Sequence, residues 1–280
     1  MTNALINLQD AKPTFKYVPP LFLIYGRNGI GKSWFASKAA RPIFLDLDQN
    51  IFELAVDSNR SFNVKLEKFQ DVLQFLGLLI NEEHSYKTVI IDSLSSLERL
   101  IENHVLQAKK VTSLADFQYG QGYLMMLPLW EQVLGKLKAL RTQKKMTVLM
   151  LGHYKEKRDP NLAGESYLHY QLDLYERAAK LLINSCSAVF FADYKVEVIH
   201  EKEKFGQEIA KARSSERRLF TDEGVKFLAK NTYGMPADIP MTWEALYAHV
   251  KAHFIKIREK LPNRAAPQQE QLTTPEGEGQ

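Results

Sequence analysis

Short apolar runs alternate along most of the chain with stretches in which apolar residues recur about every three or four positions. The short runs are typical of buried strands, and the recurring positions are typical of amphipathic helices. Strands are predicted at 21–24, 43–48, 62–64 (weakly), 88–93 and 147–151. Helices are predicted at 33–41, 72–79, 94–105 and 127–140. Strands that alternate with helices in this way predict an α/β fold with a mostly parallel central sheet flanked by helices.

The last third of the chain has a different pattern. A predicted helix at 175–183 is followed by strand patterns at 188–194, 196–199 and 217–220, which predict an antiparallel extension of the sheet. The stretch 200–213 is charged and contains a glycine, which indicates a hairpin tip or a mobile excursion.

The final helix and the two ends of the chain set the predicted boundaries. Thr242 is expected to cap a helix whose inward face carries Trp243, Leu246, Tyr247, Val250 and Phe254. Beyond 258 the composition turns to proline, glutamine, glutamate and glycine, which indicates a disordered tail. We therefore expect an N-terminal arm over 1–19, one domain over 20–258 and a tail over 259–280.

A phosphate-binding pattern, G-x-x-x-x-G-K-[ST], stands between the first predicted strand and the first predicted helix. It is formed by Gly26-Arg27-Asn28-Gly29-Ile30-Gly31-Lys32-Ser33, with Trp34 next. Its glycines let the backbone wrap around an anion because no Cβ blocks the approach. Lys32 is placed to reach the β- and γ-phosphates, and the Ser33 hydroxyl to ligate Mg²⁺. The sequence thus predicts a site for a nucleoside triphosphate, against the alternative of an ordinary glycine turn.

Polar residues follow other predicted strands at the edge where such a ligand would bind. Asp92 ends the strand at 88–93 and is a candidate for the Mg²⁺ shell. Asp46 and Asp48 end the strand at 43–48, where facing the nucleotide and capping the following turn are equally good interpretations. His153 follows the strand at 147–151 and is a candidate sensor of the γ-phosphate, or simply a histidine at a strand end.

Two glycine- or charge-rich segments have no clear period. The first, 116–123, breaks the helical pattern with two glycines. The second, 154–173, is predicted to be an irregular loop that mixes cations with aromatic side chains. Such a mixture is typical of single-stranded nucleic-acid binding, in which cations hold phosphates and rings stack on bases. The candidates are Lys155, Lys157, Arg158, Tyr167 and Tyr170, and the alternative is a solvated loop with incidental tyrosines.

Composition adds few limits. The chain has 280 residues, 45% of them hydrophobic, and a formal net charge of +4, which permits a nucleic-acid partner without requiring one. Its one cysteine, Cys186, lies in an apolar stretch and is expected to be a buried core residue. No signal peptide or long apolar run is apparent, so we expect a cytoplasmic protein without a membrane span.

The order of these motifs resembles the RecA-type ATPase core over about residues 20–240. The segment Ile91-Asp92-Ser93-Leu94 resembles that family's version of the Mg²⁺ strand, and Arg218-Leu219-Phe220-Thr221 with Ala229-Lys230-Asn231 resembles its later segments. In particular, the chain is similar to phage-encoded nucleotide-binding proteins of the AAA/RecA type that act in DNA recombination and single-strand annealing. The implied fold is a P-loop NTPase with a RecA-like core.

The resemblance also implies roles for individual residues. It assigns Lys32 and Ser33 to phosphate and Mg²⁺, Asp92 to the Mg²⁺ shell and His153 to the γ-phosphate. The family's water-activating glutamate is not securely aligned here, and Glu67 is the candidate. Family members also bring lysines from a neighbouring subunit to the nucleotide, for which Lys230 is the candidate against a solvated loop lysine.

The expected function is that of a DNA-stimulated ATPase that uses ATP and Mg²⁺, binds single-stranded DNA and assembles into a homo-oligomeric ring or filament. A single-strand-binding or replication protein is a further expected partner, in a bacterial or phage-infected cell. Two alternatives stay open. One is a non-catalytic nucleotide switch or helicase loader, which the residue after Asp92, Ser93 in place of a glutamate, favours. The other is a small-molecule or nucleotide kinase.

Overall fold

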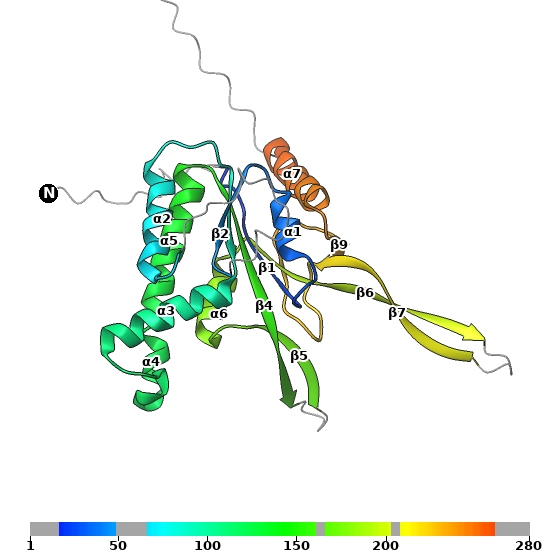
Figure 1. Cartoon of the computed structure of the whole chain (residues 1–280). Helices are drawn as coiled ribbons and strands as arrows, with labels where there is room; N and C mark the ends of the chain where they lie inside the picture. The colour runs from blue at the N-terminus through cyan, green and yellow to red at the C-terminus, as the bar shows by residue number, and fades with distance from the viewer. Residues whose placement is uncertain (1–16, 49–65, 161–165, 203–207, 261–280) are drawn as a thin grey trace, which may run out of the picture.

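The computed structural model of the chain describes residues 17–48, 66–160, 166–202 and 208–260, which fold around one nine-stranded sheet (Figure 1). Five parallel strands form its centre, in the spatial order β2 (Pro42–Asp46), β3 (Thr88–Asp92), β4 (Thr147–Pro160), β1 (Leu21–Gly26) and β6 (Ala188–Lys202). The predicted α/β class with a mostly parallel central sheet is therefore confirmed.

Antiparallel strands extend this sheet on two sides. Beyond β6 lie β7 (Glu208–Phe220) and then β9 (Asp238–Pro240), while the short β8 (Lys230–Asn231) pairs with the start of β6. The outer half of β4 pairs with β5 (Ser166–Leu172). The predicted antiparallel extension is thus confirmed.

Helices cover both faces of the sheet (Figure 1). One core lies under α2 (Phe69–Asn81), α3 (Leu94–Lys109), α5 (Leu127–Gln143) and α6 (Glu176–Ser185). The other core lies under α1 (Lys32–Ser37) and α7 (Trp243–Lys260). Along β1, Leu23 and Tyr25 enter the first core, whereas Phe22 and Ile24 enter the second. Because both sides of β1 are covered, the strand is a continuous apolar run in the sequence.

Residues 154–160 and 166–172 form a β-hairpin, and the prediction of an irregular loop over 154–173 was wrong. The outer half of β4 pairs with β5 from Tyr154 opposite Leu172 to Pro160 opposite Ser166. Tyr154 packs against Tyr170, with ring centroids 4.7 Å apart. Antiparallel backbone pairing of β4 with β5 continues along the hairpin, which projects from the body of the molecule (Figure 1). The first strand of the hairpin is mostly charged after Tyr154 and shows no apolar alternation in the sequence, which is why the segment resembled a loop.

A second hairpin, formed by β6 and β7, projects from the other side of the body (Figure 1). The strands predicted at 188–194 and 196–199 are one strand, β6, whose register with β7 shifts between Tyr194 and Val196. A bulge of this kind interrupts the alternation from which strands are predicted. Most of 200–213 is strand, and its tip, 203–207, lies outside the described residues.

The remaining elements agree with the sequence except at two points. The break at 116–123 consists of short turns, η3 (Leu114–Asp116), η4 (Gln118–Gly120) and α4 (Gln121–Leu124). The N–H of Ala245 donates to Thr242 Oγ1 at 3.3 Å, which confirms the predicted cap of α7. Tyr247, expected to point inward, is 55% exposed on the outer face of α7, and α1 ends at Ser37 rather than near 41.

The described part of the arm, residues 17–19, continues into β1, and the Tyr17 ring packs against Phe254 of α7 at 4.8 Å. Cys186 is buried, as predicted. The weak strand expected at 62–64, the start of the arm and the tail from 261 lie outside the described residues. Within the described ranges, no helix has both the length and the apolarity that crossing a bilayer requires.

Candidate nucleotide-binding site

The loop between β1 and α1 curves around its own lysine. Lys32 Nζ donates to the carbonyl oxygens of Gly26 and Arg27, each at 3.0 Å, and the side chain is buried. Gly29 and Gly31 have φ of 75° and 99°, in the left-handed region that favours glycine. A Cβ at Gly26 would meet the backbone oxygen of Ala192 on the neighbouring β6. The spacing of the glycines is therefore what this backbone path requires.

Burial perturbs the pKa of Lys32. It lowers the pKa of Lys32 to about 8, and the negative charges of Asp92 and Asp48 oppose part of that change. The buried ammonium donates to two carbonyl oxygens, and an anion that enters beside it would stabilise its charged form. Residues of the same loop line the cavity beside Lys32, and a positive charge in a glycine-rich loop favours a phosphate.

Two oxygen ligands suited to Mg²⁺ meet beside this lysine. Ser33 Oγ donates to Asp92 Oδ2 at 2.5 Å, and Asp92 is the last residue of β3. Burial raises the pKa of Asp92 to about 6, while the Ser33 hydrogen bond and Lys32 partly oppose this. Among the described residues no cluster of three or more His, Cys, Asp or Glu side chains is found. A hydroxyl and one carboxylate fit Mg²⁺, which usually takes its other ligands from phosphates and water.

The sheet explains why these groups meet. β4 lies between β1 and β3, and its residue His153 is level with Gly26 at the end of β1. Asp92 is level with Leu151 two residues earlier on β4. Because the three strands are parallel, the ends of β1 and β3 lie beside the middle of β4, and loop, histidine and carboxylate share one edge of the parallel sheet. His153 Nδ1 lies 3.5 Å from Lys32 Nζ, and burial, then the Lys32 charge, lowers the pKa of His153.

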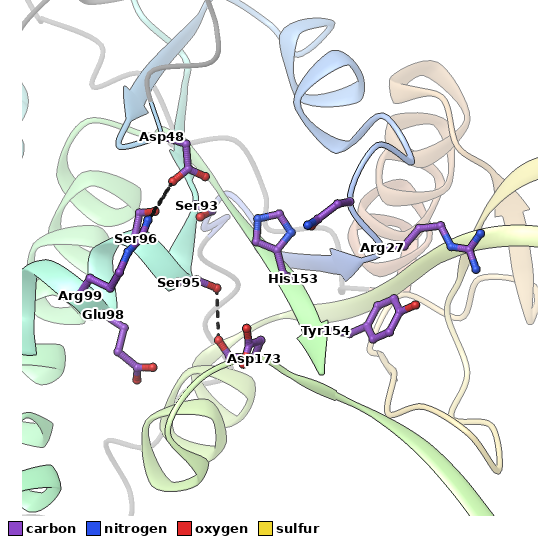
Figure 2. A pocket seen from close by; sticks show the side chains of 11 residues that line it. Arg27, Asp48, Ser93, Ser95, Ser96, Glu98, Arg99, His153, Tyr154 and Asp173 are labelled. Atoms are coloured by element: carbon purple, nitrogen blue, oxygen red, sulfur yellow. Dashed lines mark hydrogen bonds and ion pairs between the residues drawn. The ribbon is translucent and has the colours of Figure 1, made fainter. Parts of the chain in front are cut away.

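Two cavities adjoin at His153. The first, about 430 Å³, is lined by the phosphate loop together with Asp48, Asp92 and His153. The second, about 650 Å³, lies against the start of α3 and the end of β4, and shares Asn28, Asp48 and His153 with the first. Figure 2 shows this second cavity, with His153 between Asp48 and Arg27.

Asp48, and not Glu67, is the carboxylate that lines the phosphate-loop cavity together with Asp92. It accepts a hydrogen bond from Ser96 Oγ and lies 3.7 Å from an Arg99 nitrogen (Figure 2). Glu67 is exposed, just before α2, where its backbone N–H donates to Asp71. Of the two interpretations open for Asp48, the structure favours the one that faces the nucleotide site.

The residues expected to bind DNA fall into two groups: some contact other parts of the fold, and others are exposed on the hairpin. Lys155 Nζ donates to the Leu174 carbonyl oxygen at 2.7 Å and lies 3.8 Å from Asp173. Tyr170 stacks on Phe191, with ring centroids 5.6 Å apart, so its ring is part of the packing under the hairpin. The side chains of Lys155 and Tyr170 therefore make contacts within the fold itself. Lys157 and Arg158, farther along the hairpin, are exposed, and the backbone of Tyr167 pairs with β4 opposite Asp159.

The segment 116–123 carries two tyrosines, Tyr119 and Tyr123, that the sequence analysis did not name as candidates. Tyr119 is 95% exposed and has a φ of 55°, unusual for a residue other than glycine. Tyr123 stacks on Tyr175 of the segment before α6, with centroids 5.1 Å apart. The sequence feature that could have identified them is the pair of glycines, Gly120 and Gly122, next to these tyrosines.

Lys230 does not approach its own phosphate loop. It lies on β8, which pairs with the start of β6, so it stands at the opposite end of the parallel strands from Lys32. Its ammonium donates to the carbonyl oxygens of Asn184 and Cys186 at the end of α6, at 3.3 and 2.7 Å. The lysine therefore caps a helix C-terminus in its own chain.

Comparisons with known proteins give one family model and one solved structure that match this chain. A family model described as "AAA domain" matches residues 19–233. A solved structure titled "Crystal structure of the RadB recombinase" matches with 13% sequence identity over 76% of this chain and 92% of that chain, at a TM-score of 0.40. A search of curated proteins finds no match.

Proposed function

Because this chain belongs to the family of AAA domains, we propose that it is an ATPase that binds ATP with Mg²⁺ at the phosphate loop. The observation that carries the proposal is the meeting of a buried Lys32 ammonium with the Ser33–Asp92 pair in one cavity. A buried cation, a glycine-rich loop before a helix and two oxygen ligands are the set that a metal-bound triphosphate requires.

The side chains divide the chemistry among them. Lys32 holds the β- and γ-phosphate oxygens and stabilises the negative charge that develops on the transferred group. Ser33 and Asp92 would hold Mg²⁺, which when bound neutralises phosphate charge. His153, kept neutral by burial and by Lys32, donates one N–H toward the γ-phosphate. These roles agree with the resemblance that the sequence gives.

Asp48 is the residue that we propose accepts the proton of the attacking water. Its carboxylate lines the phosphate-loop cavity with Asp92 and His153, and its charge acts on both Lys32 and Asp92. Ser96 and Arg99 hold the carboxylate in one orientation. A general base must be held within hydrogen-bond reach of its water, and a side chain fixed from two sides meets that need.

We also propose that ATP binding is coupled to single-stranded DNA, in recombination, annealing or replication in a bacterial or phage-infected cell. Exposed Lys157 and Arg158 continue the same strand that carries His153, so both ligands act on β4. Exposed Tyr119 and the Tyr123–Tyr175 stack offer rings for bases. A head-to-tail ring or filament would present these surfaces to one strand.

The first test measures ATP turnover with single-stranded, double-stranded and no DNA. We expect turnover in the wild type that single-stranded DNA raises. Lys32→Ala should lower it by orders of magnitude, because a contact to the transferred phosphate stabilises the transition state by several kcal/mol. Turnover that is unchanged in Lys32→Ala would contradict the proposal.

The second test measures binding to single-stranded DNA across a range of salt concentrations. Lys157→Gln with Arg158→Gln should weaken binding and reduce the salt slope by about 1.4, since each phosphate contact contributes about 0.7 for a single strand. Lys251→Gln with Lys256→Gln, a pair of equal charge on exposed α7 positions, is the matched control and should change little. Equal effects of the two pairs would indicate a general charge effect only.

One observation favours a second candidate, a nucleotide switch that binds ATP without turnover. The residue after Asp92 is Ser93, so no carboxylate follows the metal ligand directly. If wild type binds ATP normally and shows no turnover with or without DNA, the switch is the correct function and Asp48 is not a base.

A further inference from the structure

The phosphate-loop cavity continues on two sides. On the side of His153 lies the cavity of about 650 Å³ described above. On the opposite side lies a third cavity of about 460 Å³, which shares Gly31 and Trp34 with the phosphate-loop cavity. We call it the Trp34 cavity, and its other lining residues are Glu216, Arg217, Pro240, Met241 and Thr242. A bound triphosphate therefore has two neighbouring spaces for its nucleoside.

The direction in which the triphosphate lies along the loop decides which of the two cavities receives the nucleoside. Lys32, the Ser33–Asp92 pair and His153 mark the position of the terminal phosphates. The nucleoside is at the other end of the triphosphate, so it lies away from His153 and toward Gly31 and Trp34. We propose, on the basis of the proposed ATP site, that the Trp34 cavity holds the nucleoside and that its base stacks on the Trp34 ring.

The Trp34 side chain suits this role better than a core role. It is 48% exposed although it is large and apolar, and it belongs to the first turn of α1 directly after Ser33. Lys38 Nζ lies 3.8 Å from the centroid of the ring and covers one face of it. This cation–π contact holds the ring in place and leaves the other face for a base. Aromatic rings accept any base in this way because every base has a π-face.

The opposite wall of the cavity is held by backbone pairing. Arg218 pairs with Pro240 where β7 meets β9, and the N–H of Met241 donates to the Arg217 carbonyl oxygen at 3.1 Å. Pro240 and Met241 thus line the same cavity as Trp34 from a different element and bring apolar atoms to it. A flat ring on one side and a proline and a methionine on the other form a slot suited to a planar base.

Arg217 joins this wall to the phosphate loop. Its Nη1 donates to the Ile30 carbonyl oxygen at 3.4 Å, and a Cβ at Gly31 would lie 2.6 Å from the same nitrogen. The guanidinium therefore lies between the loop and the Trp34 cavity. A positive charge at this point favours the phosphate nearest the nucleoside.

Comparison of two probes separates the nucleoside from the phosphates. ATP and inorganic tripolyphosphate, each with Mg²⁺, are titrated into the full chain by calorimetry. We expect wild type to bind ATP at least about tenfold more tightly than tripolyphosphate. Trp34→Ala should remove most of this difference by weakening ATP alone. Tyr247→Ala, at a similarly exposed aromatic residue on α7, is the control and should retain the difference.

Each outcome has one meaning. If wild type binds the two probes equally, or if Trp34→Ala weakens both by the same factor, the ring is not a base platform and the inference is wrong. In that case the ATP site itself stands as long as Lys32→Ala abolishes binding of both probes. If wild type binds neither probe, both the inference and the proposed function are overturned.

Discussion

Replacing Asp48 by asparagine keeps the size of the side chain and removes its charge from the phosphate-loop cavity. If Asp48 accepts the proton of the attacking water, Asp48→Asn should lower the rate of turnover by about 10²- to 10⁴-fold, which is about 3–5 kcal/mol in the barrier. Binding of ATP should be retained or tightened, because a negative charge near the phosphates is removed.

The structure limits how much of that effect instability could explain. Arg99, the ion-pair partner of Asp48, has a side chain that is 72% exposed, and such a pair contributes about 0–1 kcal/mol. An asparagine oxygen can still accept from Ser96 Oγ. The expected loss in stability is therefore several-fold smaller in kcal/mol than the expected change in the barrier, and thermal unfolding of the variant measures it directly.

Phosphate release in a single turnover is the appropriate assay, with two matched variants beside it. Arg99→Gln removes the partner and leaves the Asp48 carboxylate, so it should change the rate far less than Asp48→Asn does. Glu67→Gln makes the same chemical change at the exposed residue that the sequence suggested, and should leave the rate unchanged. A rate within about threefold of wild type in Asp48→Asn would refute the assignment.

Other substitutions test the loop, a buried acid and the cysteine. Gly31→Ala should destabilise the fold by about 1–2 kcal/mol and weaken ATP binding, because φ is 99° and the new methyl group meets Arg217; Gly77→Ala within α2 is the control in the same assays. Burial raises the pKa of Glu98 to about 7, so its contribution to stability is present below about pH 4.5 and is lost as pH rises through about 7. Glu98→Gln should therefore gain thermal stability relative to wild type between about pH 5 and pH 8, and a pH-independent difference would count against this. Cys186 is buried, which raises the pKa of its thiol, so a thiol reagent should label it only after unfolding.

The sequence predicted the parts of the site that depend on short, rigid patterns. The loop glycines and Lys32 lie within a few residues of each other, so one backbone path satisfies the motif. Asp92 was found because a fully buried strand leaves a continuous apolar run that ends at the carboxylate. The helices were found because their buried faces repeat with the helical period, as in α2 and α5.

The parts that the sequence missed depend on contacts between distant segments. Asp48 and Glu67 are both carboxylates after the second strand, and only the position of β2 beside β3 shows which one reaches the cavity. The hairpin of β4 and β5 is held by backbone pairing and by the packing of Tyr154 and Tyr170 on the distant Phe191, a contact that local patterns do not show. The Trp34 cavity joins α1 to residues about two hundred positions later, and local patterns carry no such information.

β4 offers a direct physical route between the proposed ATP site and the proposed DNA-binding hairpin. The same strand carries His153, which faces Lys32, and Arg158, which is exposed on the hairpin about 17 Å farther along at the usual rise of a strand. A paired strand moves as a unit, so a shift of His153 toward a bound phosphate also moves the hairpin. Thermodynamic linkage then requires reciprocity: if ATP tightens DNA binding by some factor, DNA tightens ATP binding by the same factor. His153→Ala should reduce this shared factor while each ligand still binds alone, and a factor unchanged from wild type would exclude coupling through His153.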